Sequence, residues 1–157
     1  MFATWQRLGN FARLPGGEQW FALRALGTLA LVRLALRLLA FGKVRMLVDR
    51  LAKAPRTAQD PAVARAVARA VRRAVSRAAR TIPGSVCLAQ ALTAELLLRR
   101  HGQSARVSIG VALDGKPIDA HAWVESAGMV VTGDNEHLGR YRTLAVFGCD
   151  IRVGADP

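Results

Sequence analysis

The first part of the chain has the hydrophobic spacing of helices. Residues 18–52 are rich in leucine and predict one long helix or two shorter helices, with Gly42 as the expected break. Residues 53–60 read as a linker, and Pro61 suits the first turn of the next helix. From residue 62 to residue 80, valines recur at every fourth position while arginines occupy the other faces, which predicts an amphipathic helix.

A third helical segment follows the breaker Pro83-Gly84. Ser85 is a favourable N-cap for a helix that runs from Val86 to about Arg100. The basic residues in its last turn, with Gly102 directly after them, are typical of a helix C-terminus.

The pattern changes from helical to alternating after this helix. Val107, Ile109 and Val111 alternate with smaller or polar residues, which predicts a strand. Asp114-Gly115 and Ala127-Gly128 then predict two tight turns, with further strands over residues 118–125, 129–132 and 142–147. Helices followed by strands predict an α+β fold, in which the helices pack on a small antiparallel sheet.

Composition narrows the class of protein. With 157 residues, of which 52% are hydrophobic, the chain suits one domain with a sizeable core. Its two cysteines and three histidines lack the short spacing of a zinc site or a disulfide framework. We therefore expect no metal and no cofactor, reduced thiols and a cytoplasmic location. Arg24, Arg33 and Arg37 interrupt the apolar segment 20–41, which argues against a transmembrane helix.

The formal net charge of +12 is concentrated in the N-terminal part of the chain. Residues 1–100 contain 18 Lys and Arg against 4 Asp and Glu, whereas residues 101–157 contain 5 against 7. This asymmetry favours an anionic partner, such as a membrane face approached peripherally, nucleic acid or an acidic peptide, although arginines on ordinary solvated helix faces give the same count. The arginines are not accompanied by the pattern of a nucleic-acid-binding module, so we expect no nucleic acid as partner.

Cys87 lies in the first turn of the third predicted helix. Unpaired backbone N–H groups at a helix start carry partial positive charge, which favours a thiolate. The same groups can hold the oxyanion of an acyl-transfer intermediate. The alternative is a small buried thiol that only fills space, because cysteine is among the most buried residue types.

His121 lies in the middle of the second predicted strand, between two alanines. Alternation places it on one face together with Asp119, Trp123 and Glu125. An isolated histidine is more often structural than catalytic, but near a thiol it would serve as the base.

A third polar residue follows from the strand register. If Ala127-Gly128 is a two-residue turn, Asp134 lies directly opposite His121, whereas a three-residue turn would place Gly133 there and turn Asp134 away. A carboxylate there would accept the imidazole N–H and fix its tautomer, as in a nucleophilic triad. Asp119 and Asn135 are the fallbacks for this role, and a solvated turn aspartate is the alternative interpretation of Asp134.

The order Cys, His, Asp along the chain resembles the triad of the transglutaminase-like cysteine peptidase superfamily. The local sequence resembles one branch more closely. Ser85-Val86-Cys87-Leu88 opens a helix that ends in Leu97-Leu98-Arg99-Arg100-His101-Gly102, and the next strands carry Ile109-Gly110-Val111 and Ala120-His121-Ala122-Trp123-Val124-Glu125. These segments are similar to the leader peptidases of lasso-peptide biosynthesis, the B-type maturation proteins without a fused leader-recognition domain. The leucine-rich, arginine-studded residues 20–52 extend the similarity to most of the chain.

The resemblance implies a papain-like core over residues 59–157 and a helical extension over residues 1–58. It also implies that Cys87 is the nucleophile, that His121 is base and acid, and that Asp134 is the third member. The implied substrate is a ribosomally made precursor peptide with a leader and a core. The implied partners are a separate leader-recognition protein and the lasso cyclase that closes the freed core.

Two other functions fit the same residues. One is a transglutaminase-like amidase or peptidase of another pathway. The other is a non-catalytic module whose basic helices bind a peptide or dock on a membrane.

Overall fold

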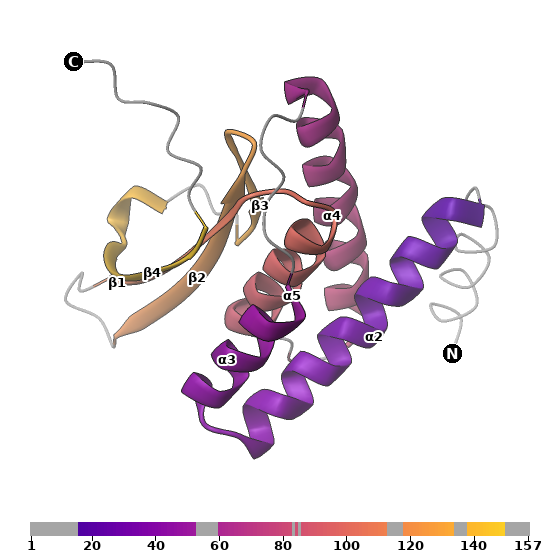
Figure 1. Cartoon of the computed structure of the whole chain (residues 1–157). Helices are drawn as coiled ribbons and strands as arrows, with labels where there is room; N and C mark the ends of the chain where they lie inside the picture. Colours follow the sequence, from indigo (N-terminus) through magenta and orange to yellow (C-terminus); the bar gives the residue numbers. More distant parts are fainter. Residues whose placement is uncertain are drawn as a thin grey trace, which may run out of the picture.

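The computed structural model describes residues 16–52, 60–82, 84, 86–112, 118–133 and 138–149. These residues form helices followed by a small four-stranded antiparallel sheet, which confirms the predicted α+β fold. Figure 1 shows the helices gathered on one side of the molecule and the sheet on the other.

The leucine-rich segment forms two helices, α2 (Gly16–Leu38) and α3 (Phe41–Leu51). The prediction of a break at Gly42 was wrong, because the chain bends at Ala40, whose backbone is extended (ψ 145°). Neither Leu39 nor Ala40 is a helix breaker, so the sequence carries no local signal for this bend. Gly42 lies in the first turn of α3, and residues 53–59 of the predicted linker 53–60 lie outside the described residues.

The amphipathic helix is present as α4 (Pro61–Thr81). Pro61 is in its first turn, as predicted. Asp60, which was assigned to the linker, is the N-cap, and its side chain accepts a hydrogen bond of 2.8 Å from the Ala62 N–H. Its buried face consists of small residues, which allow close packing against neighbouring helices: Ala68, Val71, Ala74, Val75 and Ala78.

The third helix, α5, spans Cys87–Arg100. Its N-cap is Val86, which provides no side-chain cap, so the prediction of Ser85 as N-cap was wrong by one residue; Ser85 itself lies outside the described residues. Gly102 ends the helix with a left-handed backbone (φ 76°), as predicted, and the Gln103 N–H returns to the Leu98 carbonyl.

Four strands form the sheet in the order β3-β2-β1-β4. Their bounds are Ala105–Ala112 for β1, Asp119–Ser126 for β2, Met129–Thr132 for β3 and Arg142–Cys149 for β4, with a short 3-10 helix, η1, at Leu138–Arg140. The predicted turn between β2 and β3 is confirmed, because Ala127 (φ 51°) and Gly128 (φ 73°) both have the positive φ of a type I′ hairpin. The turn predicted at Asp114-Gly115 lies outside the described residues.

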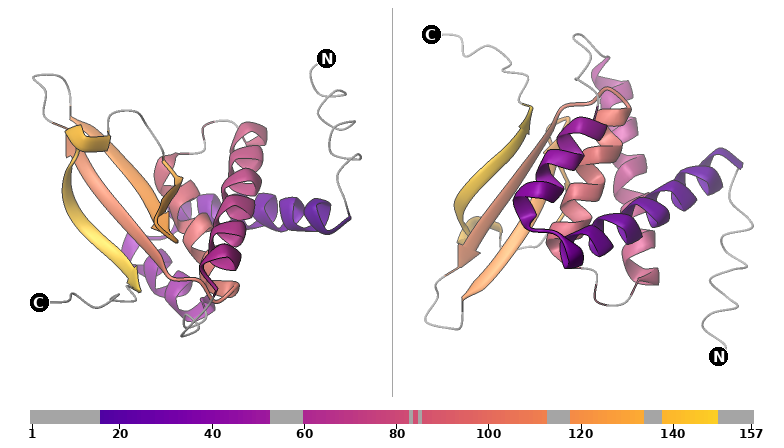
Figure 2. Two further views of the ribbon diagram at one scale, coloured as in Figure 1. Left: turned by 90° about the horizontal axis from the view of Figure 1, so that it is seen from above. Right: turned by 60° about the horizontal axis from the view of Figure 1, so that its bottom comes forward.

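The helices cover one face of the sheet. In the views of Figures 1 and 2, α5 lies beside the sheet, and α2 lies on the far side of the helical layer. The cross-strand pairs Val107–Val124 and Ile109–Ala122 face the helices and pack into one core with α2, α4 and α5.

The division of the chain into a helical extension, residues 1–58, and a core, residues 59–157, stays a prediction.

A buried ionic network joins α3 to α5. Glu95 of α5 is fully buried, and Arg45 of α3 donates to both of its carboxylate oxygens, one at 2.7 Å. The same guanidinium bonds Asp49 through Nε at 3.0 Å, and Arg99 bonds Asp49 at 2.7 Å and Glu95 at 3.1 Å. Two cations and two carboxylates therefore balance one another around the middle of the helix that begins with Cys87.

The network also makes the stability of the fold depend on pH. Hydrogen bonds from Arg45 are the main cause that lowers the pKa of Asp49 from 3.8 to about 2. A carboxylate with a lowered pKa stabilises the fold fully above pH 3.8, and this contribution is lost as the pH falls through about 2. For Arg45, burial alone would lower the pKa, but its hydrogen bonds to Glu95 and Asp49 outweigh burial and raise it.

Replacing Arg45 tests whether this network holds α3 on α5. Arg45→Met leaves the Glu95 carboxylate buried without its main partner, so we expect a loss of about 3–5 kcal/mol in the free energy of unfolding measured with urea. The double variant Arg45→Met/Glu95→Leu removes both charges and should regain most of that loss. A single variant as stable as the parent, or a double variant no better than the single one, would contradict this role.

Candidate active site

Cys87 is the first residue of α5, as the sequence predicted, and its side chain is half-buried against the core. The helical hydrogen-bond ladder starts with Ala89 and Gln90, whose N–H groups both donate to the Val86 carbonyl, at 3.0 and 3.3 Å. The N–H groups of Cys87 and Leu88 precede this ladder and point along the helix axis toward its N-terminus. They are the donors closest to the thiol, and a developing oxyanion could be held there.

His121 lies on β2, which packs directly against α5. Because Ala122 and Val124 belong to the core beneath the helices, His121 projects from the other face of the sheet. Its neighbours confirm the predicted face: the ring stacks on Trp123, with centroids 6.3 Å apart, and lies 5.2 Å from the ring of Tyr141. We refer to His121, Trp123 and Tyr141 as the aromatic cluster.

Small residues on β1 make room for the aromatic cluster. Gly110 pairs with His121, and a Cβ at Gly110 would lie 3.1 Å from the Tyr141 Cβ and 3.2 Å from the Trp123 ring. A larger residue at this position would push the rings apart. The position of the imidazole thus depends on a glycine of the neighbouring strand.

The tautomer of His121 is set by a backbone carbonyl. Its Nε2 lies 2.8 Å from the Gly133 oxygen. Since a carbonyl oxygen can only accept, Nε2 carries the proton and donates, and in the neutral ring Nδ1 has the free lone pair. Nδ1 is therefore the nitrogen that can take a proton from a thiol. The Gly133 carbonyl oxygen binds the ring at the other nitrogen, Nε2.

Gly133 suits this role because only glycine fits its position. Its backbone is left-handed (φ 73°), and a Cβ there would overlap the Ala122 carbonyl oxygen and lie 2.8 Å from the Trp123 Cβ. The carbonyl approaches His121 only because this side chain is missing. The sequence Gly133-Asp134-Asn135 signals a turn, but nothing in it indicates that the glycine carbonyl binds the histidine.

The Asp119 carboxylate forms its hydrogen bonds with residues other than His121. Its Oδ2 accepts a hydrogen bond of 2.8 Å from the Tyr141 hydroxyl and another from Arg140. The bond from Tyr141 is the main cause that lowers the pKa of Asp119 below its ordinary value, and the charges of Arg140 and His121 act in the same direction. Asp119 thus fixes Tyr141 against the imidazole.

The register used to place Asp134 was partly wrong. Glu125 pairs with Val130 as expected, but Val124 pairs with Thr132, so a β-bulge at Val131 shifts the ladder by one residue. The direct opposition of Asp134 and His121 in an unbroken ladder therefore does not hold. Asp134 and Asn135 lie outside the described residues, and Asp134 directly follows the carbonyl that binds His121.

The structure brings the elements that carry Cys87 and His121 together, but not the two side chains. Among the described residues, no hydrogen bond joins the thiol to the imidazole, and the thiol lies on the helix side of the sheet.

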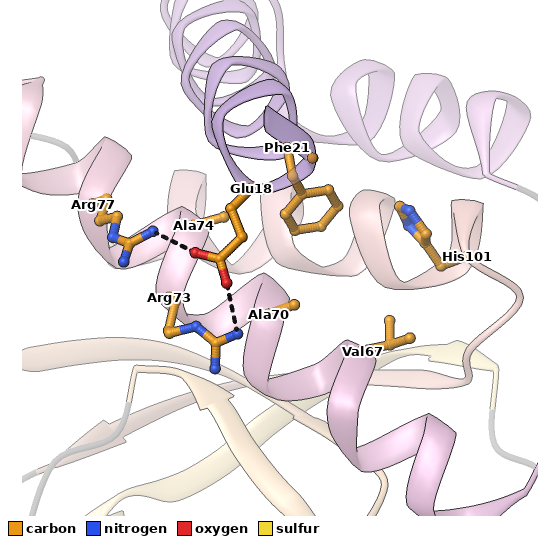
Figure 3. Close-up of a pocket in the computed structure, with 9 residues that line it drawn as sticks. Glu18, Phe21, Val67, Ala70, Arg73, Ala74, Arg77 and His101 are labelled. Atoms are coloured by element: carbon orange, nitrogen blue, oxygen red, sulfur yellow. Dashed lines mark ion pairs between the residues drawn. The ribbon is translucent and has the colours of Figure 1, made fainter. Parts of the chain in front are cut away.

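A pocket of about 250 Å³ lies elsewhere, between the start of α2, α4 and the end of α5. Figure 3 shows its apolar wall, with Phe21 and Val67, and the ion pairs from Glu18 to Arg73 and Arg77 at its rim. His101, at the far end of α5, also lines it. Since α5 is about 20 Å long, this pocket is remote from Cys87.

A comparison with protein families identifies the superfamily of the chain. A family model described as the transglutaminase-like superfamily matches residues 29–146, which include Cys87, His121 and Asp134. The chain belongs to the transglutaminase-like superfamily. No curated protein and no solved structure matches it. Members of this superfamily are usually cysteine peptidases or transferases, and the match covers both the helix that begins with Cys87 and the strand that carries His121.

Two left-handed glycines provide a matched test of the carbonyl contact. Gly128→Ala adds a Cβ that meets no atom within 4 Å, so it should cost only the backbone strain of about 1–2 kcal/mol. Gly133→Ala adds the same strain plus the overlap with Ala122, so we expect a clearly larger loss of thermal stability. In ¹⁵N NMR spectra, only Gly133→Ala should weaken the preference of neutral His121 for a protonated Nε2. Equal effects of the two substitutions would show that the Gly133 carbonyl does not hold the ring.

Proposed function

We propose that this member of the transglutaminase-like superfamily is a cysteine peptidase that removes the leader from a ribosomally made precursor peptide. The observation that carries the proposal is the position of Cys87 at the start of α5, next to the strand of a histidine with a free Nδ1. The resemblance of the segments around Cys87 and His121 to lasso-peptide leader peptidases supports the choice of substrate. A separate leader-recognition protein would present the leader, and a cyclase would take the freed core.

The first half of the reaction forms a thioester. His121 Nδ1 takes the proton of the Cys87 thiol, and the thiolate attacks the carbonyl carbon of the scissile peptide bond. The N–H groups of Cys87 and Leu88 stabilise the oxyanion that forms. As the C–N bond breaks, His121 returns the proton to the leaving amine, which is the new N-terminus of the core peptide.

The second half hydrolyses the thioester. His121 Nδ1 takes a proton from a water molecule, the hydroxide oxygen attacks the acyl carbon, and the thiolate leaves with the proton supplied by the imidazolium. In both halves Nε2 keeps its proton and its bond to the Gly133 carbonyl, which stabilises the positive ring. Asp134 would strengthen this stabilisation from the next position in the chain.

The mechanism requires one conformational step. Because the thiol lies on the helix side of the sheet and the imidazole on the other face, the part of β2 that carries His121 must move together with the start of α5 for Cys87 Sγ and His121 Nδ1 to come within hydrogen-bonding distance when the peptide binds. The buried network of Arg45 and Glu95 lies further along α5, so the helix can be held firmly there while its first turn adjusts.

The proposal is tested by incubating the protein with a candidate precursor and its leader-recognition protein, with the products read by mass spectrometry. Cys87→Ala should abolish leader removal, and His121→Gln should reduce kcat by at least 10³-fold, because each removes a group that handles the reacting atoms. Ser126→Ala, a change elsewhere on β2, serves as the control and should retain cleavage. Cleavage by Cys87→Ala would refute the assignment, whereas a thiol at Cys87 that never forms a thioester would favour a non-catalytic module.

Substitutions of Asp134 and Asp119 test which of the two aspartates is the third member of the proposed triad. Asp134→Asn should lower kcat about 10–100-fold, because the Gly133 carbonyl still fixes the imidazole. Asp119→Asn should weaken the position of Tyr141 and cost less than Asp134→Asn, since Asp119 makes no bond to His121. A larger loss for Asp119→Asn would transfer the role of third member to Asp119.

A further inference from the structure

The helix α2 is apolar on two opposite faces, and only one of them is covered. The inner face packs on α4 and α5 through Ala22, Ala25, Leu29 and Val32, which are at most 7% exposed. The outer face carries large apolar side chains that remain in solvent: Trp20 (65% exposed), Leu23 (47%), Leu31 (68%), Leu34 (52%) and Leu38 (72%). At 100° per residue, this second set centres about 180° from the first.

This outer set, which we call the outer stripe, runs the length of the helix. Its members follow one another at spacings of three, four or eight residues, with Gly27 in the longest interval, so they line one side of a straight cylinder. From Trp20 to Leu38 the stripe is about 27 Å long. Figures 1 and 2 show α2 at the edge of the molecule, with the sheet on the other side of the helices, so the fold leaves this face accessible.

Exposed apolar side chains gathered in this way mark an interaction surface, because soluble proteins rarely leave them in contact with water. None of the described helices is long and apolar enough to cross a membrane. We therefore consider a partner that binds along the exposed side of α2, without insertion of the whole helix.

The charges beside the outer stripe identify the partner. Arg24 and Arg37 are exposed and lie on either flank of the stripe. The acidic residue of α2, Glu18, is turned toward Arg73 and Arg77 of α4, as Figure 3 shows, and does not oppose an anion at the stripe. An apolar strip between arginines, with a tryptophan at one end, has the composition of a helix that lies in the interface of an anionic bilayer.

We propose that the outer stripe binds the surface of an anionic lipid bilayer. The leucines enter the boundary between headgroups and acyl chains, while the long stems of Arg24 and Arg37 keep their guanidinium groups at the lipid phosphates. A straight helix at the edge of the molecule fits a plane, and an anionic bilayer supplies the negative charges that suit both arginines. This inference is independent of the peptidase chemistry, because no residue of the candidate active site takes part.

Flotation with vesicles tests the proposal on the full-length protein. Binding to vesicles of phosphatidylglycerol and phosphatidylcholine should exceed binding to phosphatidylcholine alone and should weaken as NaCl is added. Leu31→Glu/Leu34→Glu should lower the partition coefficient on the order of 100-fold, because two apolar anchors are lost. Leu144→Glu/Val146→Glu adds the same charges at two exposed positions of β4 and should leave binding nearly unchanged.

A second pair of variants tests the role of charge. Arg24→Gln/Arg37→Gln should weaken binding to the anionic vesicles about 30-fold, at roughly tenfold or less per arginine. Arg65→Gln/Arg69→Gln changes the net charge equally on exposed positions of α4 and should have a smaller effect. Circular dichroism should show the same helix content in all variants, since every replaced side chain is exposed.

Three outcomes would overturn the proposal. The first is no flotation of the parent protein with anionic vesicles. The second is flotation that the α2 variants and the β4 control lose equally. The third is a concentration-dependent dimer, or a complex with an acidic peptide, that Leu31→Glu/Leu34→Glu abolishes while flotation persists, because the stripe would then be covered by protein.

Discussion

The packing of α5 on β2 is the contact on which the rest of the structure depends. It supplies the centre of the core, where Leu92 and Leu97 of the helix and Val124 of the strand are fully or almost fully buried. It also brings a cysteine at a helix start and a histidine on a strand onto neighbouring elements. The buried Arg45–Glu95 pair fixes α3 on the middle of this helix, so the helix that carries the thiol is held by charge as well as by apolar contact.

The sheet, for its part, fixes the position of the His121 imidazole. Gly110 leaves space for the aromatic cluster, Asp119 anchors Tyr141 against the ring, and the Gly133 carbonyl selects the tautomer. A backbone carbonyl in this position makes the third triad member less decisive than in a site where a carboxylate alone orients the base. The two halves of the proposed site are thus built independently, one by a helix start and one by a sheet face, and the proposed mechanism requires substrate binding to bring them together.

Much of the fold could be predicted from periodicity. The amphipathic α4, the cap of α5 at Gly102 and the hairpin at Ala127-Gly128 follow from local signals, and the structure confirms them. The features that the sequence did not reveal depend on contacts between distant segments. The bend at Ala40 has no breaker, the bulge at Val131 is a tertiary adjustment of the ladder, and the bond from His121 to Gly133 joins residues 12 positions apart.

The position of Cys87 could be predicted because a helix start is a local feature, and the face of His121 could be predicted because strand alternation is local as well. The distance between the two side chains could not, since it depends on how far α5 extends along β2. The exposed leucines of α2 show the same limit, because the sequence shows an apolar helix but not which of its faces the other helices cover.

The central claim is that the Cys87 thiol and His121 act as a pair, and the reactivity of the thiol tests it most directly. With Cys149 changed to Ser, Cys87 is the single thiol of the chain, so its alkylation by iodoacetamide can be followed by intact mass between pH 6 and 8. If the imidazole takes the thiol proton, His121→Gln should slow alkylation near pH 7 by at least about 10-fold. An unchanged alkylation rate in a folded His121→Gln variant would contradict the pairing and with it the proposed peptidase mechanism.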